Sequence, residues 1–199
     1  MKSAHYDLHI HSQASWDSKI SVKELLTRAL ELGLAGLAAT DHDQFTRVES
    51  PYPELLLIPG EEVSTLEGHI LALGINETIP PWLTPEETVE LIHAQGALAV
   101  ASHPFPTKEG YPGLLDKVYE LDLDGLEVTN PKDFVDNRQA RAAAKAMNVA
   151  KLGGSDAHRL EAVGTGLTVL RERAETVDDF LLEVRKKRTD GMLRASTPR

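Results

Sequence analysis

The sequence predicts an α/β protein built around a parallel sheet or barrel. Short apolar runs alternate with helical patterns from one end of the chain to the other, which is typical of βαβ units. The chain has 199 residues, 41% of them hydrophobic, enough for one sizeable core, so we expect a single domain over residues 1–199. Polar clusters that contain histidine sit at the borders of the apolar runs.

The first half of the chain predicts four strands and two helices. The helix over 21–33 has clear limits, because Ser21 and Glu24 form a capping box and Gly33 is a stop signal. The helix over 85–96 begins at a proline and closes at a glycine. We expect the strands at 4–10, 33–40, 53–60 and 68–75.

The second half repeats this alternation. It predicts strands at 97–104, 124–130 and 149–158, and helices at 113–121, at the alanine-rich segment 137–148 and at 176–188, which follows the apolar run 164–170. The sequence contains no low-complexity segment, internal repeat or linker long enough to divide domains.

Composition narrows the function. No run approaches the roughly 20 apolar residues of a membrane span, and the N-terminus lacks a signal-peptide core, so we expect a cytoplasmic protein. The chain has no cysteine, so any metal must be held by nitrogen and oxygen ligands. A net charge of -10 argues against a grip on long nucleic acid and favours a compact substrate. Oligomeric state leaves no signal in the sequence.

Six of the eight histidines lie in polar clusters that we place at the C-terminal ends of strands. In barrels of parallel strands these ends converge on one face, so residues far apart in sequence can surround a single site. The clusters read "DLHIH", "TDHD", "PGEE", "GHI", "SHP" and "GSDAH".

Two of these clusters carry metal-ligand spacing. His9 and His11 are two apart on a strand, so their imidazoles share a face and suit Zn, Mn or Fe. Asp156 and His158 repeat this spacing near the other end of the chain. Asp7 and Asp41 flank histidines and could accept hydrogen bonds that fix their tautomers, although turn or capping roles fit them equally well.

Five segments in this order, "DLHIHSQASWDS", "TDHD", "PGEEVS", "SHP" and "GSDAH", resemble the signature of the PHP family, named for polymerase and histidinol phosphatase. The resemblance extends from Tyr6 to about Leu170. It implies a distorted seven-stranded β/α barrel with two or three divalent metal ions, Zn, Mn or Fe, at its C-terminal mouth, and hydrolysis of phosphate esters.

The resemblance implies three sets of metal ligands. Glu62 is preferred to Glu61 because "EVS" at 62–64 matches the family pattern of glutamate, aliphatic residue and Ser or Thr. Some relatives have histidine at the position of Asp17, which leaves the third ion less defined. The sets are His9, His11, Glu62 and Asp156 for one ion, the bridging Glu62 with His69 and His103 for a second, and Asp17, His42 and His158 for a third.

A few further residues are candidates for contact with substrate. Asp43 is a candidate general acid for the leaving oxygen. Asn130 is expected to line the pocket, because the family often has an asparagine there, and Arg138 to meet a phosphate. Tyr111 is a candidate for a pocket wall.

The resemblance therefore implies hydrolysis of a small phosphomonoester by a metal-bridging hydroxide. Three alternatives stay open. One is a phosphodiesterase or exonuclease acting on nucleotides or short oligonucleotides. A second is an amidohydrolase, since those enzymes also begin with His-x-His on a barrel strand. The third, of a different class, is a non-catalytic metal-binding module.

Overall fold

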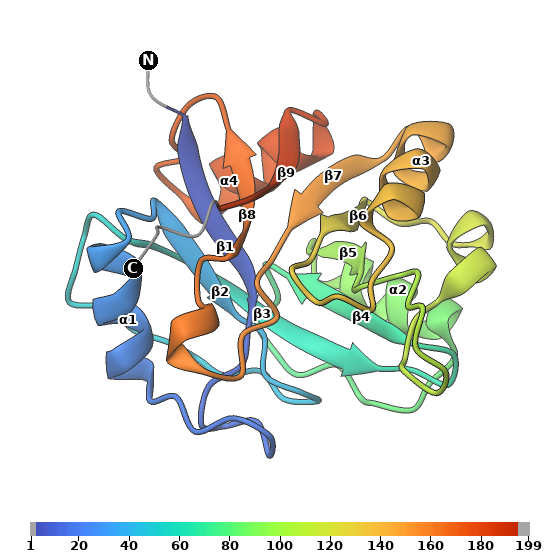
Figure 1. Ribbon diagram of the computed structural model, residues 1–199, viewed down its shortest axis with the longest axis horizontal. Coiled ribbons are helices and arrows are strands. Elements are labelled where there is room, and N and C mark those ends of the chain that lie inside the picture. Colours follow the sequence, from blue (N-terminus) through green and yellow to red (C-terminus); the bar gives the residue numbers. More distant parts are fainter. Residues whose placement is uncertain (1–2, 195–199) are drawn as a thin grey trace.

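The computed structural model describes residues 3–194, in which nine strands form one sheet curled into a nearly closed barrel (Figure 1). The strands lie side by side in the order β7-β6-β5-β4-β3-β2-β1-β8-β9. Their bounds are β1 Ala4–Ile10, β2 Gly36–Ala39, β3 Leu56–Ser64, β4 His69–Leu73, β5 Leu98–Ala101, β6 Gly125–Thr129, β7 Ala150–Gly153, β8 Gly166–Leu170 and β9 Thr189–Leu193.

Four α-helices and two 3-10 helices join these strands. Capping boxes start three of the α-helices, from Ser21 to Glu24, Thr84 to Glu87 and Thr176 to Asp179. The helices are α1 Val22–Glu31, α2 Pro85–Ala94, α3 Asn137–Met147 and α4 Val177–Arg185, with η1 Leu115–Glu120 and η2 Leu160–Ala162. Residues 113–121, expected as an α-helix, form η1 instead.

The predicted barrel is confirmed, but its strands are not all parallel. Strands β1, β2 and β3 run parallel to one another, as do β5, β6 and β7. β4 is antiparallel to β3, because residues 65–68 are too few for the crossover that a parallel pair needs, and it is antiparallel to β5 as well. β8 runs antiparallel to β1, and β9, which the sequence did not predict, pairs antiparallel with β8.

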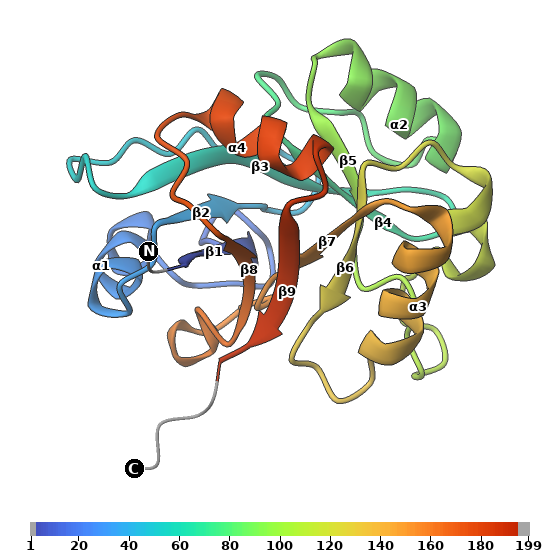
Figure 2. The same cartoon turned by 90° about the horizontal axis from the view of Figure 1, so that it is seen from above.

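The barrel approaches closure where β7 faces β8 and β9 (Figure 2). The Thr168 hydroxyl of β8 accepts a hydrogen bond from the backbone N–H of Gly153 and donates one to its carbonyl, each at 2.8 Å. A Cβ at Gly153 would lie 2.5 Å from the Leu167 carbonyl oxygen. Only glycine therefore allows this approach of the two strands.

The hydrophobic core has an inner part and two outer parts. The inner part fills the barrel with side chains from seven strands and is closed by Phe180, Leu181 and Val184 of α4. The outer parts lie beneath α1 on one side and beneath α2, η1 and α3 on the other. α4 lies beside the N-terminal end of β1, where the Phe180 ring packs at a tilt against the Tyr6 ring, with 5.1 Å between their centroids. This leaves the C-terminal ends of the parallel strands free for a site.

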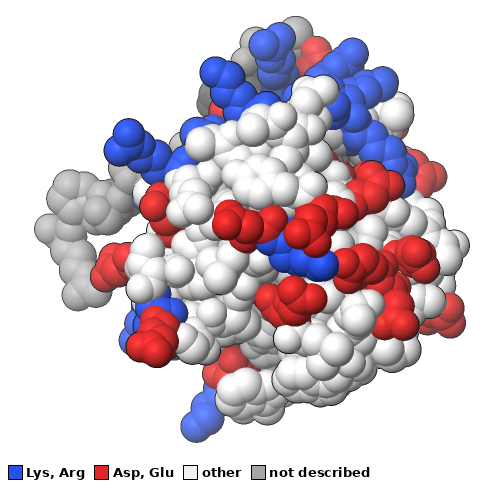
Figure 3. Space-filling model, turned by 90° about the vertical axis from the view of Figure 1, so that its right-hand side faces the viewer, with Lys and Arg blue, Asp and Glu red and all other residues white. Residues whose placement is uncertain are grey.

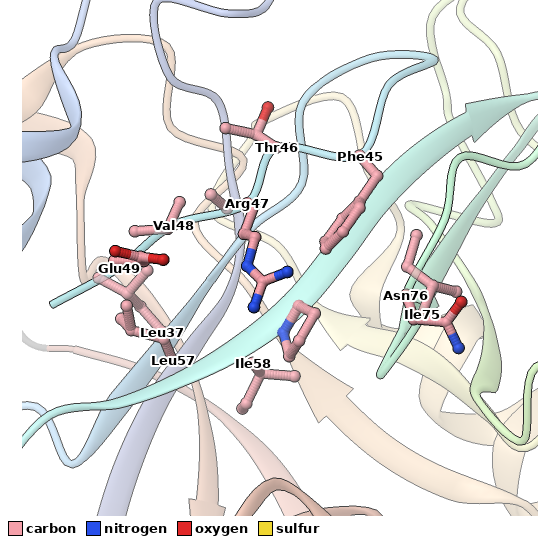
Figure 4. A pocket seen from close by; sticks show the side chains of 12 residues that line it. Leu37, Phe45, Thr46, Arg47, Val48, Glu49, Leu57, Ile58, Ile75 and Asn76 are labelled. Atoms are coloured by element: carbon pink, nitrogen blue, oxygen red, sulfur yellow. The ribbon is translucent and has the colours of Figure 1, made fainter.

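The connection from β2 to β3, residues 40–55, contains no helix. An extended segment covers the outer face of these two strands and encloses a cavity of about 310 Å³. Figure 4 shows Val48 and Glu49 of this segment beside Leu37 of β2 and Leu57 of β3. Within residues 3–194, no helix has the length and apolar character required to cross a bilayer.

Candidate metal centre

Glu62 lies at the centre of a buried cluster of histidines. Its side chain is 1% exposed and follows the parallel part of β3. One carboxylate oxygen, Oε2, lies 3.2 Å from His9 Nε2 and 3.3 Å from His11 Nε2. The other, Oε1, lies 3.0 Å from His103 Nε2 and 3.1 Å from His69 Nδ1. A single carboxylate thus faces two pairs of imidazole nitrogens.

Asp156, in the loop after β7, closes the side of the cluster next to β1. Its Oδ1 lies 3.7 Å from His9 Nε2 and 3.6 Å from His11 Nε2. The two Nε2 atoms are 3.2 Å apart. Two bare lone pairs at this distance repel each other, so a proton or a cation must lie between them.

A third group joins the loop after β1 to the loop after β7. His158 Nε2 lies 2.8 Å from Asp17 Oδ2, and His42 Nε2 lies 3.4 Å from the same oxygen. His42 also connects this group to the centre, because its Nδ1 is 3.4 Å from Glu62 Oε2.

His69 reaches the cluster by a route that the sequence did not predict. We placed it at the C-terminal end of a strand, but it is the first residue of β4. Because β4 is antiparallel to β3 and β5, its N-terminal end lies at the same mouth as the C-terminal ends of its neighbours. The antiparallel direction of β4 therefore brings its first residue, His69, to the site.

The structure brings all nine expected metal ligands into one cluster. They fall into four overlapping groups in which the candidate donor atoms all lie within 4.8 Å of one another. Glu61, the neighbour of Glu62, points elsewhere and accepts a hydrogen bond from the backbone N–H of Ile79. The groups are His9, His11 and Glu62; His9, His103 and Asp156; His42, Glu62 and His69; and His11, Asp17, His42 and His158.

The charges of the cluster fit divalent cations. Burial alone would raise the pKa of Glu62, but the surrounding histidines, His9 foremost, hold it well below its usual value. Burial likewise opposes protonation of His11, yet Asp156 and Glu62 raise its pKa to about 9. Protons on imidazoles can therefore balance the buried carboxylates, and a metal ion that binds there would displace such protons.

Polar atoms without partners also fit bound cations. Asp17 Oδ1 and His103 Nδ1 are buried and make no hydrogen bond within the described residues. Imidazole nitrogens and carboxylate oxygens together suit Zn, Mn or Fe. His103 and Asp156 also hold left-handed backbone angles, with φ of 27° and 51°, a strain of the kind that clusters at functional sites.

Several expected substrate residues do not line this cluster. Asp43 accepts hydrogen bonds from the backbone N–H and the hydroxyl of Ser64, at 2.7 and 3.0 Å. Asn130 is fully buried. Arg138 lies in the first turn of α3 and is exposed. None of the three borders the cavity above the cluster.

That cavity, of about 320 Å³, has walls that the sequence only partly indicated. Tyr111, a candidate from the sequence, lines it and donates a hydrogen bond to Asp156 Oδ2 at 3.3 Å. Trp16, Phe134 and Lys132 line it as well, and Lys132 Nζ lies 3.8 Å from Asp156 Oδ2. Lys132 and Phe134 sit in a loop without a recognisable motif, so no sequence signal pointed to them, and Trp16 lies within "DLHIHSQASWDS", where only the expected metal ligands were selected.

Asp7 and Asp41 do not bind the histidine rings. Asp7 accepts from the backbone N–H groups of Ser155 and Gly164, and Asp41 binds the backbone N–H and hydroxyl of Ser12. Of the two roles that the sequence left open, the turn-stabilising one is therefore correct.

Family models cover both ends of the chain. The model of the PHP domain matches residues 7–79, and that of a PHP-associated region matches residues 135–189. A relative from Methanocaldococcus jannaschii, the uncharacterized protein MJ1587, is 39% identical over 140 residues, 62% of this chain and 80% of that protein. The chain belongs to the PHP family. The predicted class, a metal-dependent phosphoesterase of the PHP type, is confirmed at this level.

Other proteins are similar to this chain in fold or over part of its sequence. A two-domain protein from Bacteroides vulgatus, described as containing a predicted PHP-like metal-dependent phosphoesterase, superposes with a TM-score of 0.78 at 18% identity. The match covers 96% of this chain and 65% of that protein. The 5'-3' exoribonuclease Rnm of Escherichia coli is 40% identical over 86 residues, 38% of this chain and 29% of the relative.

Proposed function

We propose that this PHP domain, taken as one unit over residues 1–199, hydrolyses a small phosphomonoester with two or three divalent metal ions. The observation that carries the proposal is the position of Glu62, whose two oxygens face separate pairs of histidines. Such a carboxylate is suited to bridge two ions. Two ions held by these residues would supply positive charge for a displacement at phosphorus.

The chain's own residues divide the work of binding the ions. Zn, Mn and Fe all suit the donor atoms. When bound, the ions lower the pKa of a water molecule to near neutrality and offset the charge of the phosphoryl oxygens. The proposed ligands are His9, His11, Glu62 and Asp156 for one ion, Glu62, His69 and His103 for the second, and Asp17, His42 and His158 for the third.

Lys132 is the proposed phosphate contact. Its ammonium group borders the cavity 3.8 Å from Asp156 Oδ2 and is 30% exposed, so it can turn from this carboxylate to an incoming phosphoryl oxygen. Tyr111 limits the cavity on the same side, and its hydroxyl holds Asp156 in place.

Cavity size and surface charge favour a small substrate. A cavity of about 320 Å³ is at the lower end of the range for ligand sites. The net charge is -10, and Figure 3 shows acidic side chains over the middle and right of one face, with basic side chains gathered mainly along its top. A long polyanion would be repelled by such a surface.

A phosphodiesterase acting on nucleotides or short oligonucleotides is the second candidate. The shared segment with the exoribonuclease Rnm supports it. So does Trp16, which is 84% exposed at the edge of the cavity and offers a face on which a base could stack.

The test compares p-nitrophenyl phosphate with bis(p-nitrophenyl) phosphate, with added Mn²⁺ and with a chelator. We expect faster turnover of the monoester and loss of activity with the chelator. Preference for the diester would favour the second candidate. Turnover unaffected by complete metal removal, or absent from both esters, would contradict the proposal and favour a non-catalytic module.

A pair of histidine variants separates the cluster from the rest of the protein. His11→Ala removes an imidazole whose Nε2 faces Glu62 and Asp156, so we expect turnover to fall by at least about 100-fold, as for loss of a group that holds a catalytic ion. His93→Ala is the matched control, because His93 lies on α2 and binds Asp124 outside the cluster. Equal activity of the two variants would remove His11 from the site.

A further inference from the structure

Glu127, at the centre of β6, is a buried carboxylate that the proposed ligand sets do not use. It is 1% exposed. Its Oε1 lies 3.1 Å from His9 Nδ1. Its Oε2 accepts hydrogen bonds from the backbone N–H of His103 at 2.7 Å and from Asn130 Nδ2 at 3.1 Å. Both oxygens are thus occupied by donors, and two of these belong to proposed ligand residues.

The contact with Glu127 determines which nitrogen of His9 faces the cluster. An ionised carboxylate only accepts hydrogen bonds, so Nδ1 of His9 must carry the hydrogen. In the neutral ring the lone pair is then on Nε2. This atom points at Glu62 Oε2, 3.2 Å away.

The backbone around Glu127 holds this arrangement tightly. A Cβ at Gly154 would lie 2.3 Å from His9 Cβ and 2.9 Å from Glu127 Oε1, so only glycine fits beside the pair. The pairing of β6 with β7 shifts register between Glu127 and Thr129. Such irregularities re-aim side chains next to functional sites.

We propose that Glu127 is the positioning residue of the metal centre, which fixes His9 with Nε2 available to an ion and holds the backbone at His103. This inference rests on the proposed metal centre. Glu127 acts through other residues, because it does not border the cavity and belongs to none of the candidate ligand groups.

Glu127→Gln tests the proposal with nearly the same shape. The amide has one acceptor and one donor, whereas the site presents donors to both oxygens. If the amide oxygen faces His9, the NH₂ group meets the N–H of His103. If it faces His103, the NH₂ group donates to His9 Nδ1 and forces the hydrogen onto Nε2. Either orientation impairs a proposed ligand.

The readout is the dissociation constant for Zn²⁺ and, separately, Mn²⁺, measured by titration of the metal-free protein beside its thermal unfolding. We expect binding to weaken about 10- to 100-fold in E127Q, as is usual for the acceptor behind a metal-bound histidine. Asp124→Asn is the matched control. Asp124 likewise accepts from an imidazole, that of His93, and from a backbone N–H, that of Ala99, but far from the cluster. Its metal affinity should equal that of the parent protein.

Unchanged metal affinity in E127Q would overturn the role of Glu127 and leave the proposed function standing. A parent protein that binds neither metal would overturn both. If E127Q does not fold, ¹⁵N NMR of histidine-labelled parent protein loaded with Zn²⁺ decides the question. We expect His9 to carry hydrogen on Nδ1 and metal on Nε2, and the reverse assignment would contradict the proposal.

Discussion

Two lysines near the mouth of the barrel differ in their contacts. Lys132 is the ammonium group that lines the cavity above the cluster, whereas Lys108 lies over the Phe134 ring, 5.5 Å from its centroid, outside the lining. Both lysines belong to loops that flank the same cavity. Comparing them separates contact with the phosphoryl group from the general effect of positive charge nearby.

Lys132→Ala is expected to raise KM for a phosphomonoester about tenfold or more while changing kcat less, since hydrogen bonds to charged groups contribute roughly 1.5–3 kcal/mol. Steady-state kinetics at fixed Mn²⁺ measures both constants. Lys108→Ala removes the same charge and should leave KM nearly unchanged. Similar rises in KM for both variants would show that Lys132 acts only through the field of its charge.

The sequence identified some residues of the site and missed others, for reasons that lie in the residues themselves. Histidines and carboxylates at strand borders are rare enough to be noticed, and the cluster contains all nine residues that the sequence selected as metal ligands. Glu127 escaped because a glutamate within "LEVTN" looks like many half-exposed strand residues. Its function depends on a contact with His9 across 118 positions of sequence, which no local pattern encodes.

At the scale of elements, local signals fixed the helices better than the strands. The limits of α1 and α2 follow from capping groups and glycines that act within a few residues. Strand direction depends on partners distant in sequence, so the reversal of β4 was not foreseen. β9 reads "TDGML" and is half exposed, so it lacks the apolar run that predicts a strand.

The cap of α2 allows a test of this local control. The Thr84 hydroxyl accepts from the backbone N–H of Glu87 and donates to its carboxylate. Thr84→Ala should therefore lower the free energy of unfolding by about 1 kcal/mol, measured in urea, with activity unchanged. Thr27→Ala, within α1, removes no cap and should stay within about 0.5 kcal/mol of the parent. A larger loss at Thr27 would contradict this account.

At the scale of the whole molecule, stability and chemistry lie at opposite ends of the barrel. α4 seals one end with Phe180, which is fully buried against Tyr6, and Glu62 lies at the other. In Figure 1, α4 lies near the N-terminal end of β1, and β1 runs from there down toward the loops of the site. The same strands run between the two ends, but the side chains that pack against α4 are not those of the metal cluster.

Phe180→Ala should accordingly lower the free energy of unfolding by about 3–5 kcal/mol, the usual loss for a buried phenylalanine. The specific activity of the folded fraction should stay close to that of the parent at low temperature. Chemical denaturation measures the free energy of unfolding, and assays well below the unfolding midpoint of the variant measure the specific activity. Leu182→Ala, 46% exposed on the same helix, is the control and should cost little. Loss of activity in proportion to stability would contradict this separation.

The helix-free connection between β2 and β3 has a consequence for local opening of the protein. Residues 45–49 of this connection belong to neither helix nor strand and lie over a cavity, so their amide hydrogens should exchange with solvent through small fluctuations rather than through global unfolding. His42 lies at the start of the same connection and reaches Glu62 and Asp17. An ion bound by His42 would attach one end of this connection to the cluster. Binding of metal should therefore slow amide hydrogen exchange in the segment that covers the outer face of β2 and β3.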